Sequence, residues 1–111
     1  MTGLNKDAEL PTPSLVPLHA LWFFEAVARQ KSFTKASRVL AVTQSAVSKQ
    51  VRNLENSLGL ELFERRGTEV TLTEAGTVLL ACVQPMLLSL NQTVQALARA
   101  TPKNAPERPQ F

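Results

Sequence analysis

The sequence has few of the side chains that catalysis, metal binding and crosslinking require. Its 111 residues include one cysteine (Cys82), one histidine (His19) and no tyrosine. A single cysteine excludes an intrachain disulfide, and one cysteine far from one histidine makes no metal cluster. With no visible secretion signal, this composition fits a reducing cytoplasm. We therefore expect a cytoplasmic protein without a cofactor. It should not be an enzyme, because no nucleophile, base and orienting partner can be assembled.

Other absences narrow the function further. The sequence has no glycine-rich phosphate loop and no internal repeat. No apolar run reaches membrane-spanning length, so we expect no membrane partner. The hydrophobic content of 44% is normal for a globular protein. The net charge of +3 and the pI near 9.5 are compatible with nucleic acid without proving it. The length suits one small domain plus an extra element.

The most informative stretch covers residues 43–58 and reads TQSAVSKQVRNLENSL. Its apolar residues recur at helical spacing and form one stripe: Val47, Val51, Leu54 and Leu58. The other face is rich in hydrogen-bond donors, with Gln44, Ser45, Ser48, Lys49, Arg52 and Asn53. Amide and cationic side chains can pair with base edges in a DNA major groove. Taken alone, the stretch is more simply interpreted as an ordinary amphipathic helix with a solvated polar face.

The residues before this stretch change that interpretation. Ser32 is a plausible cap for a short helix over 34–40, with Ala36, Val39 and Leu40 pointing inward. Residues 41–43 make a short turn, and Thr43 can cap the next helix. A short helix, a tight turn and a longer amphipathic helix form a helix-turn-helix over about 33–52. The turn lacks the glycine often found there, so the motif alone is moderately specific.

A helix that precedes this motif should supply much of the core. Pro17 can open a helix that runs to residue 30. One stripe of this helix should face the core, through Leu18, Leu21, Phe24 and Ala28. The stripe is widened by Trp22, Phe23 and Val27 beyond what one neighbouring helix would cover. A later segment should therefore pack on this helix as well.

After the amphipathic helix the pattern changes to short strands. Gly59 should end the helix, and Leu60, Leu62 and Phe63 return apolar groups to the core. A hairpin with its turn at Gly67 follows, and Arg65 and Arg66 lie near its tip. Such a wing would lie along phosphates or the minor groove. The alternative is a solvated basic hairpin partnered by Glu61, Glu64 and Glu69.

A long apolar helix is predicted over 74–100, capped by Thr73. It is too apolar to stand alone in water and longer than the small domain, so we expect it to pair with the same helix of a second chain. Gly76 should weaken its first turn, and Pro85 should kink or loosen it. The predicted homodimer interface comprises Trp22, Val78, Leu79, Cys82, Met86, Leu90, Val94 and Leu97.

These elements predict a mainly α fold. A winged helix-turn-helix of three helices and a two-stranded wing would occupy 16–73, followed by the long dimerisation helix. Residues 1–15 are polar and contain prolines, which predicts a flexible arm. Residues 101–111 carry three prolines and predict a flexible tail or an interdomain linker.

The order of several motifs resembles the LysR-type family of bacterial transcriptional regulators. These motifs are SFT, then VTQSAVSKQVRNLE, then LGLELFERR, then LTEAG, and the resemblance runs from about residue 16 to residue 100. It implies a winged helix-turn-helix and a long linker helix that forms a homodimer. It also implies sequence-specific recognition of double-stranded DNA at an inverted-repeat promoter site.

The resemblance also implies roles for individual residues. Base edges would be contacted by Gln44, Ser48 and Lys49, with Ser45 nearby. Phosphates would be held by Thr34, Thr43 and Arg52, and Arg65 and Arg66 match the family's basic wing. Lys49 stands where the family often has arginine. A lysine lacks the planar fork that reads guanine bidentately.

Full-length members of the family continue into a domain that senses a small effector, and this sequence has no such domain. We expect either an excised DNA-binding fragment, which the proline-rich end favours, or a naturally short regulator. A small-molecule effector would act only through the missing domain. Two other interpretations stay open. One is a helical adaptor whose winged domain binds protein. The other is a winged-helix regulator of another family, such as a molybdate-responsive one.

Overall fold

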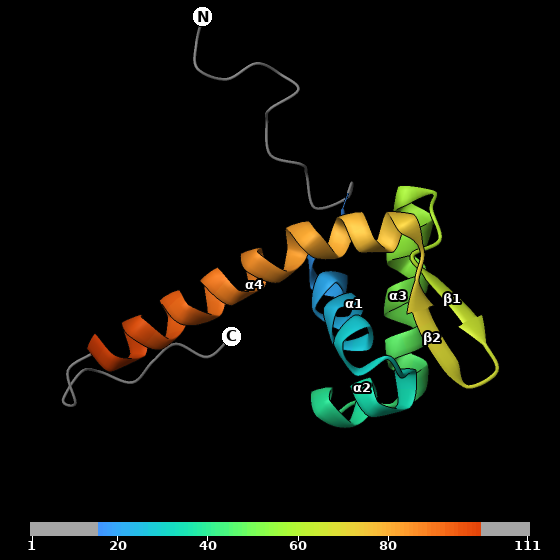
Figure 1. The fold of residues 1–111 in the computed structure, drawn as a ribbon. Coiled ribbons are helices and arrows are strands. Elements are labelled where there is room, and N and C mark those ends of the chain that lie inside the picture. The colour runs from blue at the N-terminus through green and yellow to red at the C-terminus, as the bar shows by residue number, and fades with distance from the viewer. Residues whose placement is uncertain (1–15, 101–111) are drawn as a thin grey trace, which may run out of the picture.

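The structure is a computed structural model that describes residues 16–100. The elements follow one another as α1 (Leu18–Gln30), α2 (Phe33–Leu40), α3 (Gln44–Leu58), β1 (Phe63–Arg66), β2 (Glu69–Leu72) and α4 (Glu74–Ala100). This order confirms the predicted fold class, a mainly α winged helix-turn-helix followed by a long helix (Figure 1). The predicted arm and tail, residues 1–15 and 101–111, lie outside the described residues.

The core is built around α1, whose apolar face is wide enough to contact both α3 and α4. Phe24 and Val27 are fully buried, together with Val47 and Leu54 of α3. Since the packing of an apolar face supplies most helical stability, this contact fixes the orientation of α3.

Three residues that we expected in the core are instead half exposed. They are Leu18, Val39 and Leu60, at 55%, 53% and 51% exposure. Leu18 is the first residue of α1 and lies beyond the edge of the core. Val39 is not on the buried face of the short helix α2. Leu60 follows the end of α3 in an irregular loop. The periodicity had indicated the right helices but not where the core stops.

The helix ends follow the predicted capping chemistry. The Ser32 hydroxyl accepts a hydrogen bond from the Lys35 backbone N–H at 3.0 Å, and the Thr43 hydroxyl accepts one from Ala46 N–H at 3.1 Å. Gly59 ends α3 with φ 69°. Ala41 takes the place of the absent turn glycine and adopts a left-handed conformation with φ 59°. The turn between α2 and α3 therefore forms without glycine, at some conformational cost.

The wing is an antiparallel hairpin that is attached to both α3 and α4. Phe63 pairs with Leu72 and Arg65 with Val70 in its register. The Glu55 carboxylate of α3 accepts a hydrogen bond from the Leu62 backbone N–H at 2.8 Å. At the other side, the Thr73 hydroxyl donates to the Glu61 carbonyl at 2.6 Å and accepts from the Gly76 N–H at 3.0 Å. These bonds hold the base of the wing in a fixed position.

The long helix α4 crosses α1 and then runs well past the rest of the domain (Figure 1). It buries Gly76, Val83 and Leu87 in its first half, whereas every residue from 88 to 100 is exposed. Gly76 is required by packing, because an added Cβ would collide with the Leu62 carbonyl oxygen. The helix stays continuous through Pro85.

The expectation that no apolar run reaches membrane-spanning length was wrong for α4. By length and composition alone it is apolar enough to cross a membrane, and 11% of its most apolar window is buried. The polar residues that interrupt its apolar run are uncharged, and its charged residues, Glu74 and Arg99, lie near its two ends. The same composition is found in helices that pair with one another.

Candidate nucleic-acid interface

The polar face of α3 gathers the side chains that we predicted to contact bases. Six of its residues line a shallow depression of about 540 Å³: Gln44, Ser45, Ser48, Lys49, Arg52 and Asn53. Two of these six side chains are cationic, and none of the six carries a carboxylate. The opposite face of α3 is buried in the core. The helix can therefore present the depression to a partner without disturbing its own packing.

Thr34 makes a contact that the sequence analysis did not predict. Its hydroxyl donates a hydrogen bond to the Gln44 side-chain oxygen, Oε1, at 2.9 Å. This bond joins the start of α2 to the start of α3 across the turn. Sequence reasoning missed it because the two residues are ten positions apart and no local pattern brings them together.

The first turn of α3 has the features of a helix start that attracts an anion. Thr43 caps this turn, and its hydroxyl also lies 3.3 Å from the Ser45 hydroxyl. Free backbone N–H groups at a helix start attract phosphate, because the helix dipole is positive there. There is no acidic residue in the first turn of α3 to oppose that attraction.

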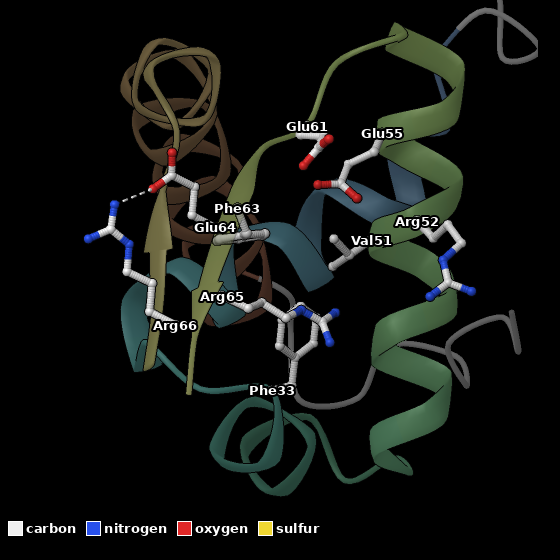
Figure 2. Close-up of a pocket in the computed structure, with 9 residues that line it drawn as sticks. All are labelled: Phe33, Val51, Arg52, Glu55, Glu61, Phe63, Glu64, Arg65 and Arg66. Atoms are coloured by element: carbon white, nitrogen blue, oxygen red, sulfur yellow. Dashed lines mark ion pairs between the residues drawn. The ribbon is translucent and has the colours of Figure 1, made fainter. Parts of the chain in front are cut away.

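A second concave region lies between the wing and α3, with a volume of about 660 Å³ (Figure 2). It has a mixed charge: Arg52, Arg65 and Arg66 share its lining with Glu55, Glu61 and Glu64. Figure 2 shows that the carboxylates of Glu55 and Glu61 approach each other near the base of the wing. Arg65 extends away from them toward the start of α2. The Arg65 end of this cleft is thus the end that lies nearest the start of α2 (Figure 2).

The two wing arginines differ in their surroundings. The Arg65 guanidinium lies over the Phe33 ring, 4.1 Å from its centre. Arg66 projects to the opposite side of the hairpin, and its side chain is 82% exposed (Figure 2). Its Nη2 lies 3.7 Å from a Glu64 carboxylate oxygen. The alternative interpretation, a basic hairpin partnered by glutamate, therefore describes Arg66 better than Arg65.

The predicted dimer residues form a separate apolar surface. Val78, Met86, Leu90, Val94 and Leu97 are between 46% and 68% exposed along α4, and Cys82 is exposed among them. Leu79 differs from the rest, because it is half-buried against the core of its own chain.

Trp22, the predicted interface residue on α1, lies beside other residues of α4. It is 40% exposed and lies in a groove of about 660 Å³ between α1 and α4, with Pro85 and Leu88 on the other side. At the edge of the groove, Arg29 Nε lies 3.1 Å from a Glu25 carboxylate oxygen, and this hydrogen bond raises the pKa of Arg29. Sequence reasoning had predicted that a later segment covers the wide face of α1. The structure shows that α4 covers this face only in part.

No cluster of three or more histidine, cysteine or acidic side chains suited to a metal ion occurs within residues 16–100.

The sequence is similar to known regulators of transcription. It is 42% identical over 91 residues to the glycine cleavage system transcriptional activator of Escherichia coli (strain K12), covering 82% of this chain and 30% of that protein. It is 57% identical over 61 residues to the RuBisCO operon transcriptional regulator of Allochromatium vinosum, covering 55% of this chain and 20% of that protein. The chain therefore spans less than a third of the length of these relatives.

The fold is also similar to solved structures. One is a BenM DNA-binding domain in complex with benA site 1 DNA, with a TM-score of 0.67 and 35% identity, covering 74% of this chain and 92% of that chain. Another is a complex of the CbnR DNA-binding domain with DNA, with a TM-score of 0.62 and 31% identity, covering 75% and 97%.

The model of the family described as bacterial regulatory helix-turn-helix protein, lysR family, matches residues 18–77. These residues run from the start of α1 to the first turn of α4 and include the whole winged helix-turn-helix. The chain belongs to the lysR family of bacterial regulatory helix-turn-helix proteins, whose relatives named above are transcriptional regulators rather than enzymes.

Proposed function

We propose that this chain is the sequence-specific DNA-binding module of a transcription regulator that acts in the cytoplasm. The polar face of α3 is the observation that carries this proposal. Its donor-rich side chains form one continuous surface without a carboxylate, and the major groove offers acceptors to match. An enclosed catalytic site is a poor alternative, because this surface is open and its side chains are exposed or half-exposed.

Each group of side chains has a proposed role. Gln44, Ser45, Ser48 and Lys49 contact base edges. Phosphates are held by Arg52 and by the first turn of α3, with its cap Thr43. The wing then lies along the DNA backbone or in the minor groove. Arg65 is the wing cation nearer to α2, and Arg66 is the cation on the outer side of the hairpin.

We further propose that two copies bind together through α4. This helix carries exposed apolar residues along its length, and Trp22 lies in a groove beside it with Pro85 and Leu88. Water solvates such apolar surfaces poorly. Pairing of two α4 helices would place the two α3 helices in successive major grooves, about 34 Å apart. Inverted-repeat DNA matches such two-fold symmetry.

Selection of bound duplexes from a random pool tests the proposal. The expected product is an inverted repeat whose half-sites lie one helical turn apart, with affinity that falls steeply as salt rises. Ser48→Ala should relax the preference at one base position by about 1–3 kcal/mol. A chain that binds no duplex even at low salt would overturn the proposal and favour a protein-binding adaptor.

A further inference from the structure

We propose that Thr34 is a positioning residue for base recognition and does not contact phosphate. Its hydroxyl holds the side-chain amide of Gln44 in one orientation, so that the amide nitrogen faces the DNA. This inference rests on the proposed function, since it assigns a specific role within the same DNA-reading surface.

The argument begins with the single proton of a hydroxyl group. The Thr34 hydroxyl donates this proton to Gln44 Oε1 at 2.9 Å. Phosphate oxygens have no proton to give at neutral pH, so a hydroxyl can bind them only as a donor. A Thr34 hydroxyl that holds Gln44 therefore has nothing left with which to bind a phosphate.

The surrounding structure keeps Thr34 in place. It stands in the first turn of α2, where Ser32 caps the helix through the Lys35 N–H. The Ser37 hydroxyl donates to the Thr34 carbonyl at 2.7 Å. Thr34 itself is β-branched, so few side-chain rotamers are open to it. The hydroxyl is consequently presented from a well-fixed support.

Gln44 has the opposite character. It is the first residue of α3, its side chain is exposed, and a free glutamine loses considerable rotamer entropy on binding. A hydrogen bond to Thr34 removes part of that freedom before DNA arrives. Such preorganisation strengthens binding, because less ordering remains for the complex to supply.

The bond also decides which end of the amide is free. With Oε1 directed to Thr34, both protons of Nε2 remain available. They match acceptors in the major groove, which are N7 of the purines, O6 of guanine and O4 of thymine. Cytosine offers only a donor there. We therefore expect the base that Gln44 faces to be other than cytosine.

A double-mutant cycle tests the inference. The wild-type chain first selects its duplex, and binding is then measured to every single base-pair substitution of that duplex for T34V, T34S, Q44A and T34V/Q44A. T34V keeps the shape of the side chain and removes the hydroxyl. It should lower discrimination at the Gln44 position by about 2- to 12-fold, the usual range for one hydrogen bond. T34S should restore discrimination, and T34V should add nothing in the Q44A background.

A different pattern of binding would contradict the inference. If T34V weakens binding to all duplexes uniformly, and its effect adds to that of Q44A, Thr34 contacts a phosphate and the inference is wrong. Equal thermal melts for wild type and T34V show that folding is unchanged, and T34A serves as a second variant if they differ. Failure of the proposed function would look different: the wild-type chain would select no duplex, or Q44A would leave all base preferences as they were.

Discussion

The guanidinium of Arg65 lies 4.1 Å from the centre of the Phe33 ring, which connects the wing to the first residue of α2. Phe33 also packs edge-to-face against Phe63, which lies in β1 together with Arg65, and the ring centres are 5.9 Å apart. The buried Phe33 ring thus contacts the wing twice: it packs against Phe63 in the core, and it holds the Arg65 guanidinium over its face. The contact places a cation beside the helix-turn-helix before any DNA is present.

The first prediction concerns this ring. Phe33→Leu removes the π face and keeps an apolar side chain, so it should weaken DNA binding by about 2- to 5-fold, which corresponds to the cation–π energy at an exposed site. In an Arg65→Ala background the same substitution should change affinity no further. Phe63→Leu is the matched control, because it removes the neighbouring ring and leaves Arg65 its partner. Fluorescence anisotropy with a labelled duplex measures all four variants. Equal losses for Phe33→Leu and Phe63→Leu would mean that core packing, not the cation–π contact, matters.

The second prediction separates the two wing arginines. Arg65→Ala should reduce the steepness of the salt dependence by about one, as expected for the loss of one phosphate contact. Arg66→Ala should reduce it less, because the Arg66 guanidinium lies on the outer side of the hairpin and already faces Glu64 at 3.7 Å. Affinity measured across a salt series gives both slopes. A larger change for Arg66→Ala would reverse our assignment of the inner and outer faces.

The third prediction tests the apolar surface of α4. Leu90→Lys should convert a dimer to monomers, since it places a charge in the middle of the exposed apolar stripe. Gln92→Lys adds the same charge on a different side of the same helix and should leave the dimer intact. Sedimentation velocity reports the oligomeric state. Leu90→Lys should also weaken binding to an inverted repeat more than to a single half-site, and identical behaviour of the two lysine variants would contradict the proposed interface.

The fourth prediction concerns the contact between α4 and the wing. Gly76→Ala should destabilise the fold by about 1–3 kcal/mol, the usual cost of overpacking, because the new methyl group meets the Leu62 carbonyl and the Leu72 side chain. Thr77→Ala, at the exposed neighbouring position, should change stability by about 0.5 kcal/mol or less. Urea unfolding compares the two. A tolerated Gly76→Ala would show that the wing can move away from α4.

Much of this protein followed from the sequence by itself. The polar side chains of 43–58 lie on one side of a helix because their spacing matches its 3.6-residue period. Ser32, Thr43 and Thr73 cap helices because their hydroxyls reach backbone N–H groups within their own turn. Such local interactions depend on neighbours in the chain, so the element order and the composition of the polar face of α3 could be predicted.

Contacts between distant segments were decided only in the tertiary structure. Gly76 had suggested a weak first turn of α4, whereas its lack of a side chain lets α4 approach the wing. Arg65 and Arg66 are adjacent in sequence and chemically alike, yet strand alternation sends them to opposite sides of the hairpin, where only Arg65 meets Phe33. Thr34 meets Gln44 because the turn at 41–43 brings two helix starts together. A sequence period specifies which face a residue occupies, but the partner on that face depends on how the elements pack against one another.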